Sequence, residues 1–290
     1  MSWRIVVIDS KAKLTYKNDY LVVRNDNIRR IHLSEINTVI VNSTAVVITS
    51  YLINELIKRK IKIIFCDETR SPAGEIMPYY GCHNSSKRIN EQLYWDKEFA
   101  VDVWTRIIKE KIHNQLILLK HYGEKNADKL DVYIEELQRN DETNREGHAA
   151  KVYFDTLFGM SFKRDDGSDL NAALNYGYTV LLSQFNRDIV AYGYLTQLGI
   201  KHRNEFNPYN LSSDLMEPFR PLIDKIVRDN IDEGFDGAMK IKLIDVLNQQ
   251  VVINRSKQYV SNAIAIYVKS VFQAIKKHNL NELKFIEYEL

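Results

Sequence analysis

The spacing of apolar residues changes once along this chain, near residue 90, and that change determines the fold class. Before it, short runs rich in β-branched residues recur at strand length, separated by turn-forming Asn and Asp residues. After it, apolar residues follow the roughly 3.6-residue period of amphipathic helices. We therefore expect an α+β protein, with a small β-rich domain and linker at residues 1–85 and a larger all-α domain at residues 86–290.

The β-rich part predicts six strands and one helix. The strands are expected at Trp3–Asp9, Lys13–Lys17, Tyr20–Arg24, Arg29–Leu33, Asn37–Asn42 and Ile61–Cys66, and the helix at Thr49–Lys60. A strand, a helix and a strand in succession predict one parallel pair within an otherwise antiparallel sheet. The stretch Asp67–Ser86 contains several proline and glycine residues and is expected to be a loop or linker.

The second part predicts a succession of helices. They are expected at Glu98–His121, Ala127–Gln138, Thr143–Leu157, Leu170–Leu198 (as one helix or two), Leu211–Asp229, Ala238–Val252 and Ser256–His278. Gly159 and Gly199 are expected to end the third and fourth of these helices. The polar stretch Phe162–Asp169 between them is expected to be an exposed loop.

Composition argues against several protein classes. Charged residues make up 27% and hydrophobic residues 45%, as in ordinary globular proteins, and a net charge of +2 does not by itself indicate nucleic-acid binding. Two cysteines without a C-x-x-C pair make a disulfide framework or cysteine-bound zinc unlikely and fit a reducing cytoplasm. No apolar run approaches the ~20 residues that span a bilayer, and the first residues resemble a strand and not a signal peptide. We expect a soluble cytoplasmic protein with no membrane partner.

A histidine and the two carboxylates of Asp214 and Glu217 occur together in the segment His202–Pro221. Asp214 and Glu217 are three residues apart, so a helix would place both carboxylates on one face. One imidazole nitrogen with several hard oxygens suits Mg²⁺ or Mn²⁺ better than a closed structural zinc site. Spacing alone leaves ordinary alternatives open: a surface histidine, an aspartate that complements the helix dipole, and a solvated glutamate.

The same segment predicts where its helix begins. Ser212 and Ser213 are candidates for the N-cap. Pro218 and Pro221 follow, and proline is best tolerated in the first turn of a helix. The helix is therefore expected to start or bend near Glu217.

A third carboxylate, Glu146, lies at the start of the helix predicted at Thr143–Leu157. Thr143 and Glu146 fit a capping box, which would account for Glu146 without any catalytic role. Gly147 costs about 1 kcal/mol relative to alanine inside a helix. Its presence indicates that some group approaches the backbone closely beside Glu146.

Three motifs occur in order behind the β-rich part. They read E-G-H-A-A-K-V-Y-F from Glu146, G-I-K-H-R-N from Gly199 and N-L-S-S-D-L-M-E-P-F-R-P from Asn210. Together they closely resemble the universal CRISPR-associated integrase, the endonuclease subunit of CRISPR adaptation and the first of the numbered Cas proteins. The resemblance covers essentially the whole chain, and K-I-H-N-Q at 111–115 also fits it. The chain is most similar to the version found in type II systems, which have a single large effector nuclease.

The resemblance implies the metal ligands. It assigns Glu146, His202 and Glu217 to a divalent metal, Mg²⁺ or Mn²⁺, and makes these three residues catalytic. Asp214 matches a second acidic position of the family and is a further catalytic candidate. Its role stays open between orienting a ligand, binding a second ion and capping a helix.

The resemblance also implies a reaction. A 3′-hydroxyl of short foreign DNA would attack a phosphodiester of a CRISPR repeat array, and one ester bond would replace another. Such a transesterification needs no ATP site, and the chain contains no P-loop motif. Arg203 and Arg220 flank the acidic residues and are candidates for binding DNA phosphate. The alternatives are a plain metal-dependent DNA or RNA nuclease that uses water, and a DNA-binding scaffold without catalysis.

The partners implied by the resemblance follow from this reaction. They are double-stranded DNA, both as the short foreign fragment and as the repeat array, a second copy of the chain joined through the β-rich domains, and the small companion subunit of the adaptation complex. Contacts with the effector nuclease and other adaptation factors are a further expectation in a single-effector system.

Overall fold

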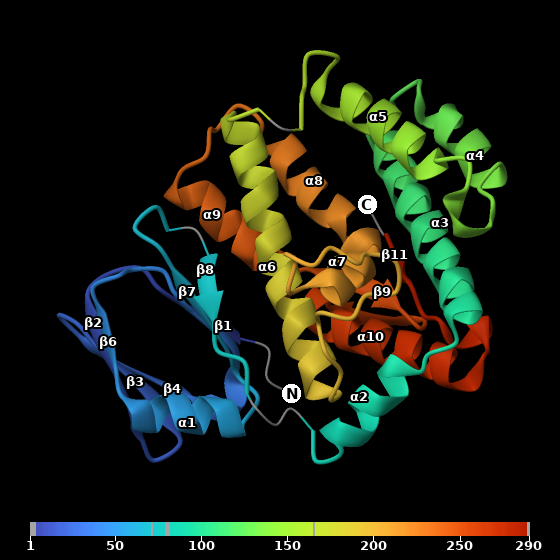
Figure 1. The fold of residues 1–290 in the computed structure, drawn as a ribbon. Coiled ribbons are helices and arrows are strands. Elements are labelled where there is room, and N and C mark those ends of the chain that lie inside the picture. Colours follow the sequence, from blue (N-terminus) through green and yellow to red (C-terminus); the bar gives the residue numbers. More distant parts are fainter. Residues whose placement is uncertain (1–3, 71, 79–81, 165, 289–290) are drawn as a thin grey trace. The chain divides into compact units, whose positions relative to one another are not determined.

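The computed structural model describes residues 4–70, 72–78, 82–164 and 166–288, and the chain divides into two compact units (Figure 1). The first comprises Met1–Ser85 together with Val190–Gly193, and the second comprises Ser86–Ile189 and Tyr194–Leu290. Strands dominate the first unit and helices the second, which confirms the predicted α+β class. Trp3 in the first predicted strand and residues 71 and 79–81 in the predicted linker lie outside the described residues.

Two four-stranded sheets form the amino-terminal unit. The first has the order β1-β5-β7-β8, with β1 (Arg4–Ile8), β5 (Ile36–Val41), β7 (Lys62–Cys66) and β8 (Pro72–Glu75). The second has the order β4-β3-β2-β6, with β2 (Ala12–Lys17), β3 (Tyr20–Arg24), β4 (Ile28–His32) and β6 (Val46–Ile48). Strands β6 and β8 were not expected from the sequence. Because β8 forms within Asp67–Ser86, the prediction of an uninterrupted loop there is wrong.

The parallel pair predicted from the strand, helix and strand order is confirmed in β5 and β7. The prediction that the rest of the sheet is antiparallel is wrong, because β1 is also parallel to β5. The residues between β1 and β5 form the antiparallel strands of the second sheet, so the chain returns to the first sheet in the original direction. Asn18 and Asp19 make the tight turn between β2 and β3 with φ angles of 48° and 65°, as a two-residue hairpin requires.

The hydrophobic core of this unit accounts for its one helix, α1 (Ser50–Lys58). All six residues of β5 are buried, as expected for a strand covered on both faces. Leu52 and Leu56 lie one turn apart on α1 and are fully buried in the same core. The side chain of Thr49 accepts a hydrogen bond from the backbone N–H of Leu52 and caps the helix.

Helices dominate the second unit. They are α2 (Ser85–Leu93), α3 (Lys97–His121), α4 (Ala127–Glu135), α5 (Arg145–Phe158), α6 (Asp169–Ala191), α7 (Asn210–Met216), α8 (Arg220–Asp229), α9 (Gly237–Ile244) and α10 (Val260–Lys277). Short 3-10 turns form η1 (Leu33–Glu35) in the first unit and η2 (Arg139–Asp141), η3 (Glu217–Phe219), η4 (Asp245–Asn248) and η5 (Leu280–Glu282) in the second. The long helix α3 packs against α4, α5, η3 and α8. Among the helices described here, none has the length and apolarity that crossing a membrane would need.

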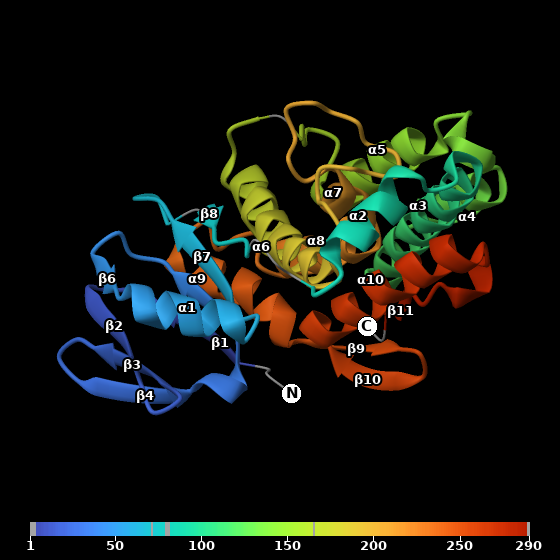
Figure 2. The same ribbon diagram turned by 60° about the horizontal axis from the view of Figure 1, so that its bottom comes forward.

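The prediction that the second domain is all-α is wrong near the carboxyl terminus. Strands β9 (Gln250–Ile253), β10 (Ser256–Tyr259) and β11 (Ile286–Glu287) form a sheet of order β10-β9-β11 (Figure 2). Asn254 and Arg255 connect β9 and β10 with φ angles of 52° and 61°, which is the backbone of a two-residue hairpin turn. The β-branched run of β9 and this turn end the helix that was predicted at Ala238–Val252.

The helix predicted at Leu170–Leu198 is shorter than expected, because α6 ends at Ala191. Gly193 has a φ of 86° there, a backbone conformation that does not continue a helix. The residues after it, up to Asn210, form an irregular segment that carries His202.

Candidate metal centre

Glu146 lies in the first turn of α5, but the capping box predicted for it is wrong. The carboxylate of Asp141 accepts hydrogen bonds from the backbone N–H groups of Arg145 at 2.6 Å and Glu146 at 3.1 Å. Asp141 reaches them because Asn144, at the N-cap position, has the left-handed conformation. The hydroxyl of Thr143 has no hydrogen-bond partner among the described residues. Since Asp141 accepts the hydrogen bonds of the first N–H groups of α5, the carboxylate of Glu146 is not needed as a cap and can contact other groups.

Gly147 is explained by a contact within the same turn. A Cβ atom at this position would lie 2.7 Å from Oδ1 and 2.9 Å from Nδ2 of Asn144. The close approach inferred beside Glu146 therefore exists, and the approaching group is the side chain of Asn144.

Glu217 lies at a bend between two helices, as predicted. Helix α7 ends at Met216, Glu217 begins the single turn η3, and α8 starts at Arg220. Pro218 and Pro221 occupy the first turns of η3 and α8, where a missing backbone N–H costs little. The bend buries Glu217 while its carboxylate stays at a helix start, where a negative charge is stabilised.

The predicted N-cap at Ser212 or Ser213 is wrong. Helix α7 already begins at Asn210, with Tyr209 at the N-cap position and no side-chain cap. The side chain of Asn210 accounts for the earlier start, because its amide donates to the carbonyl oxygens of Gln197 at 3.1 Å and Asn204 at 2.9 Å. These bonds hold both ends of the segment around His202.

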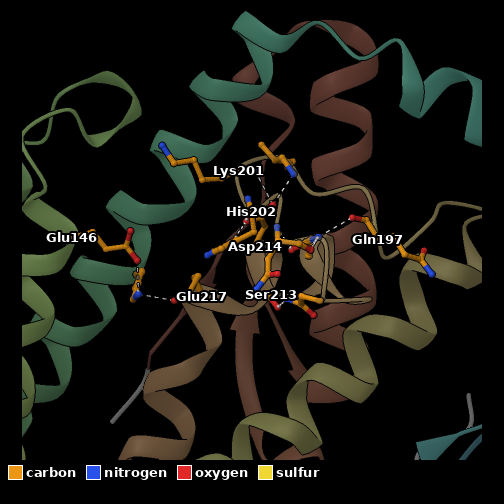
Figure 3. Close-up of polar contacts among 12 residues, drawn as sticks. Glu146, Gln197, Lys201, His202, Ser213, Asp214 and Glu217 are labelled. Carbon is orange, nitrogen blue, oxygen red and sulfur yellow. Dashed lines mark hydrogen bonds and ion pairs between the residues drawn. The ribbon is translucent and has the colours of Figure 1, made fainter. Parts of the chain in front are cut away.

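Lys111, on α3, joins the two glutamates. Its Nζ lies 2.7 Å from Oε1 of Glu146 and 2.6 Å from Oε2 of Glu217. In Figure 3, the carboxylates of Glu146 and Glu217 point toward a common nitrogen from α5 and η3. Burial alone would lower the pKa of Lys111, but the negative charges of Glu217 and Glu146 raise it above its ordinary value. Lys111 opens the K-I-H-N-Q stretch that fits the family resemblance, but the sequence assigned it no role in the centre.

Arg220 holds the other oxygen of Glu217. Its Nε donates to Oε1 of Glu217 at 3.0 Å, and its guanidinium carbon lies 4.6 Å from the ring centroid of Tyr178. Burial would raise the pKa of Glu217, but the positive charges of Arg220 and Lys111 hold that pKa below its ordinary value. Glu217 therefore stays ionised despite its burial.

Asp214 organises the segment that carries His202. Its fully buried carboxylate accepts hydrogen bonds from the backbone N–H groups of Ile200 at 2.6 Å, Lys201 at 2.9 Å and His202 at 3.2 Å. It also lies 2.5 Å from Nδ1 of His202 (Figure 3). Its oxygens thus bind the segment preceding α7 and not the start of its own helix.

Gly199 is required for this arrangement. A Cβ atom there would lie 2.4 Å from the carbonyl oxygen of His202 and 2.8 Å from Oδ2 of Asp214. The G-x-x-H part of the motif therefore reflects the tight packing of the segment against Asp214.

The hydrogen bond that His202 donates to Asp214 also orients its imidazole. Since an ionised carboxylate only accepts hydrogen bonds, Nδ1 carries the hydrogen and Nε2 remains available for a ligand. The ring packs edge-on against Trp104, with centroids 5.8 Å apart. The hydrogen bond to Asp214 raises the pKa of His202 above its ordinary value, against the effect of burial, and the charges of Glu217 and Glu146 add to the increase.

These donors suit a hard divalent cation in kind. Glu146 and Glu217 already share one cation, the ammonium of Lys111, and His202 offers a nitrogen whose other ring atom is fixed by a carboxylate. Oε2 of Glu217 is buried and has no partner in hydrogen-bond geometry within the described chain, although the ammonium lies beside it. In the parts of the chain that the structure describes, no three His, Cys, Asp or Glu side chains are clustered tightly enough to hold a metal ion. The ammonium of Lys111 lies between the carboxylates of Glu146 and Glu217.

The two candidate DNA-binding arginines differ in their surroundings. Arg220 is half-buried and paired with Glu217, so it supports the centre. Arg203 is exposed and lines a pocket of about 930 Å³ that also borders His202. Phe206, with 85% of its surface exposed, and Trp95 line the same pocket.

A buried network lies next to the centre and was not predicted. Asp224 on α8 accepts hydrogen bonds from the hydroxyls of Tyr153 at 2.8 Å and Tyr178 at 2.5 Å. Burial raises the pKa of Asp224 to about 6, although both hydrogen bonds oppose the increase. Tyr178 also contacts Arg220, so this network links α5, α6 and α8 to the partner of Glu217.

Comparisons with known proteins agree with the motifs. The family model described as CRISPR associated protein Cas1 matches residues 5–236. A relative from Neisseria meningitidis, named CRISPR-associated endonuclease Cas1, is 33% identical over 294 residues, which cover 99% of this chain and 97% of the relative.

Solved structures share the fold. A casposase bound to integration product has a TM-score of 0.76 at 18% identity, over 97% of this chain and 92% of the casposase chain. A chain of a Cas6-RT-Cas1--Cas2 complex has a TM-score of 0.75 at 20% identity over 99% of this chain, which spans 36% of that longer chain. The resemblance inferred from the three motifs is confirmed by the family match and by the identity over nearly the full length. This chain belongs to the CRISPR-associated Cas1 family.

Proposed function

We propose that this protein is a metal-dependent DNA integrase and endonuclease that inserts short foreign DNA into a CRISPR repeat array. One observation carries the proposal: Glu146 and Glu217, from two separate helices, share one cation beside a histidine oriented by Asp214. The names of the relatives support nuclease chemistry, and the fold shared with a casposase bound to integration product supports strand joining.

Glu146, His202 and Glu217 are the proposed ligands of Mg²⁺ or Mn²⁺. Once bound, the metal would polarise the scissile phosphate and lower the pKa of the attacking hydroxyl. Asp214 holds Nδ1 of His202 and leaves Nε2 available, and Arg220 fixes one oxygen of Glu217, so that both donors are oriented in advance. His202 must lose its proton before it can act as a ligand, because only neutral imidazole has a free lone pair.

The proposed reaction is a transesterification. The 3′-hydroxyl of the incoming DNA attacks a phosphorus atom of the target strand, a new ester bond forms, and the target's own 3′-oxygen leaves with the proton balance restored from solvent. Arg203 is the proposed phosphate contact, because it is exposed and charged and lines, together with His202, a pocket of about 930 Å³. Arg220 has a supporting role through Glu217.

We further infer the partners. Solved relatives of the same fold are Cas6-RT-Cas1--Cas2 complexes, which favours assembly with a small Cas2-like companion subunit. We propose that the chain forms a homodimer, acts on double-stranded DNA in the cytoplasm and, in the single-effector setting, cooperates with the effector nuclease.

The test is strand transfer with matched variants. Purified protein and its companion subunit are mixed with labelled duplex DNA and a supercoiled repeat-bearing plasmid, in Mn²⁺, in Mg²⁺ and in chelator. Metal-dependent joining of label to plasmid is expected for the wild type and for Glu135→Gln, an exposed glutamate on α4, and not for Glu217→Gln.

The other outcomes of the strand-transfer experiment would favour different functions or contradict the metal centre. Cutting without joining would favour a plain nuclease. Joining or cutting that survives in chelator would contradict the metal centre. DNA binding without cutting or joining by the wild type, unchanged in Glu146→Gln, His202→Ala and Glu217→Gln, would favour a DNA-binding scaffold.

A further inference from the structure

The ammonium of Lys111 lies where a metal would have to bind. It comes from α3, while the two carboxylates that it contacts come from α5 and η3. Glu146 is 35 residues from Lys111 in the sequence. Its Nζ is 2.7 Å from Glu146 and 2.6 Å from Glu217, and these contacts bring the two carboxylates together around one positive charge. A divalent cation that used the same oxygens would compete with this ammonium directly.

Burial makes the competition strong. The side chains of Lys111 and Glu217 are only 12% and 6% exposed, so solvent screens their charges weakly. Lys111 and Arg220 together balance the charges of the two glutamates. A metal ion that approaches with Lys111 in place therefore meets two glutamates whose negative charges are already balanced.

The ammonium is also replaceable. Its contact with Oε2 of Glu217 is close but lacks hydrogen-bond geometry, so that oxygen is held by charge and not by a directional bond. Lysine carries its charge on a flexible four-carbon stem with freely rotating donors, which can move to a new position. The planar guanidinium of Arg220, by contrast, stacks on Tyr178 and keeps its hold on Glu217.

We infer that Lys111 is a built-in competitor of the divalent metal: it holds Glu146 and Glu217 together in the metal-free protein and leaves both carboxylates when the metal binds. This inference rests on the proposed metal centre. It makes Lys111 a residue that sets metal affinity, because binding includes the displacement of a buried ammonium.

The first test measures Mn²⁺ binding by the full-length protein. Dissociation constants are determined by calorimetry for the wild type, Lys111→Met and Lys120→Met. Methionine keeps the unbranched shape without the charge, and Lys120 lies on the same helix in an exposed ion pair with Asp131. We expect Lys111→Met to bind Mn²⁺ about tenfold more tightly than the wild type or more, and Lys120→Met to match the wild type.

The other outcomes separate the two proposals. Equal or weaker binding by Lys111→Met, while the wild type binds Mn²⁺, would overturn the competitor role and leave the metal centre standing. Absence of Mn²⁺ binding in both proteins would overturn the metal centre and this inference with it.

A second measurement uses the wild type alone and does not depend on whether the variant folds. Lysine side chains are labelled by reductive methylation in chelator and in saturating Mn²⁺, and labelling is quantified for each residue by mass spectrometry. Lys111 is expected to be protected in chelator and to become severalfold more reactive with Mn²⁺, while Lys120 stays unchanged. Continued protection of Lys111 in Mn²⁺ would show that the ammonium stays in place, which overturns the inference.

Discussion

Nδ1 of His202 lies 2.5 Å from Oδ1 of Asp214, and the same buried carboxylate accepts hydrogen bonds from three consecutive backbone N–H groups, those of Ile200, Lys201 and His202. One side chain thereby fixes both the path of the segment and the orientation of its imidazole. A residue that does not itself touch the shared cation can therefore control the centre.

Asp214→Asn is expected to weaken both the fold and metal binding. An amide offers one acceptor oxygen where the carboxylate offers two, and its NH₂ group would face backbone donors. We expect a loss of roughly 2–4 kcal/mol in unfolding free energy, and Mn²⁺ affinity lower by about 10-fold to 100-fold. Thermal unfolding and calorimetry measure the two effects, with exposed Asp232→Asn as control. Unchanged stability would contradict the structural role of Asp214.

Gly199→Ala is expected to displace the imidazole of His202. The new Cβ would lie 2.4 Å from the carbonyl oxygen of His202, so the segment has to shift. A displacement near 1 Å in a catalytic site costs on the order of 100-fold in rate. Strand-transfer rates measure the loss, and Gly167→Ala is the matched control because its Cβ would meet no atom within 4 Å. Equal rates for the two variants would argue against the packing role of Gly199.

These two predictions concern residues that are close together in the sequence. His202, Asp214 and Glu217 are within sixteen positions, and prolines mark the bend after them, so spacing grouped these residues as candidates and the resemblance to the family assigned their roles. The other half depends on contacts between distant segments. Lys111 is 35 residues from Glu146 and on a different helix from Glu217, and periodicity describes it only as one more residue of a long helix.

The wrong predictions have a common physical cause. Thr143 and Ser212 are both good caps by residue type, but Asp141 accepts the hydrogen bonds at the start of α5, and α7 already begins at Asn210 without a side-chain cap. Asn254 and Arg255 likewise adopt positive φ angles that neither residue type requires, and these angles create the β9–β10 hairpin. Backbone conformations of this kind are chosen by tertiary packing, which one sequence does not reveal.

Asp224 is expected to make stability depend on pH. Its pKa is about 6 in the folded protein, against an ordinary value of 3.8, so the folded state binds this proton more tightly. The stability that this group contributes is fully present below pH 3.8 and is lost as pH rises through about 6, by roughly 3 kcal/mol. Asp224→Asn is expected to remove this decrease, as measured by denaturant unfolding from pH 4 to pH 8.

Asp229, on the same helix, provides a control of opposite sign. Burial would raise its pKa, but Lys225 and Tyr122 hold it below the ordinary value. Its contribution is present above the ordinary pKa and is lost as pH falls through the lowered one. Asp229→Asn should therefore lower stability at neutral pH. It should keep the decrease in stability as pH rises through about 6. If Asp224→Asn kept that decrease as well, the assignment of the decrease to Asp224 would be contradicted.

The two arginines are expected to separate DNA binding from support of the centre. Arg203 is exposed beside His202, so Arg203→Gln should weaken DNA binding uniformly and reduce the salt dependence by about one counterion, with stability unchanged. Arg220→Gln should instead cost roughly 1–3 kcal/mol of stability, because it removes the partner of buried Glu217 and the cation stacked on Tyr178. DNA affinity across a salt series and thermal unfolding of both variants measure these effects. If Arg220→Gln changed only the salt dependence of DNA binding, the guanidinium of Arg220 would be a DNA contact. Other residues would then have to hold Glu217 in place.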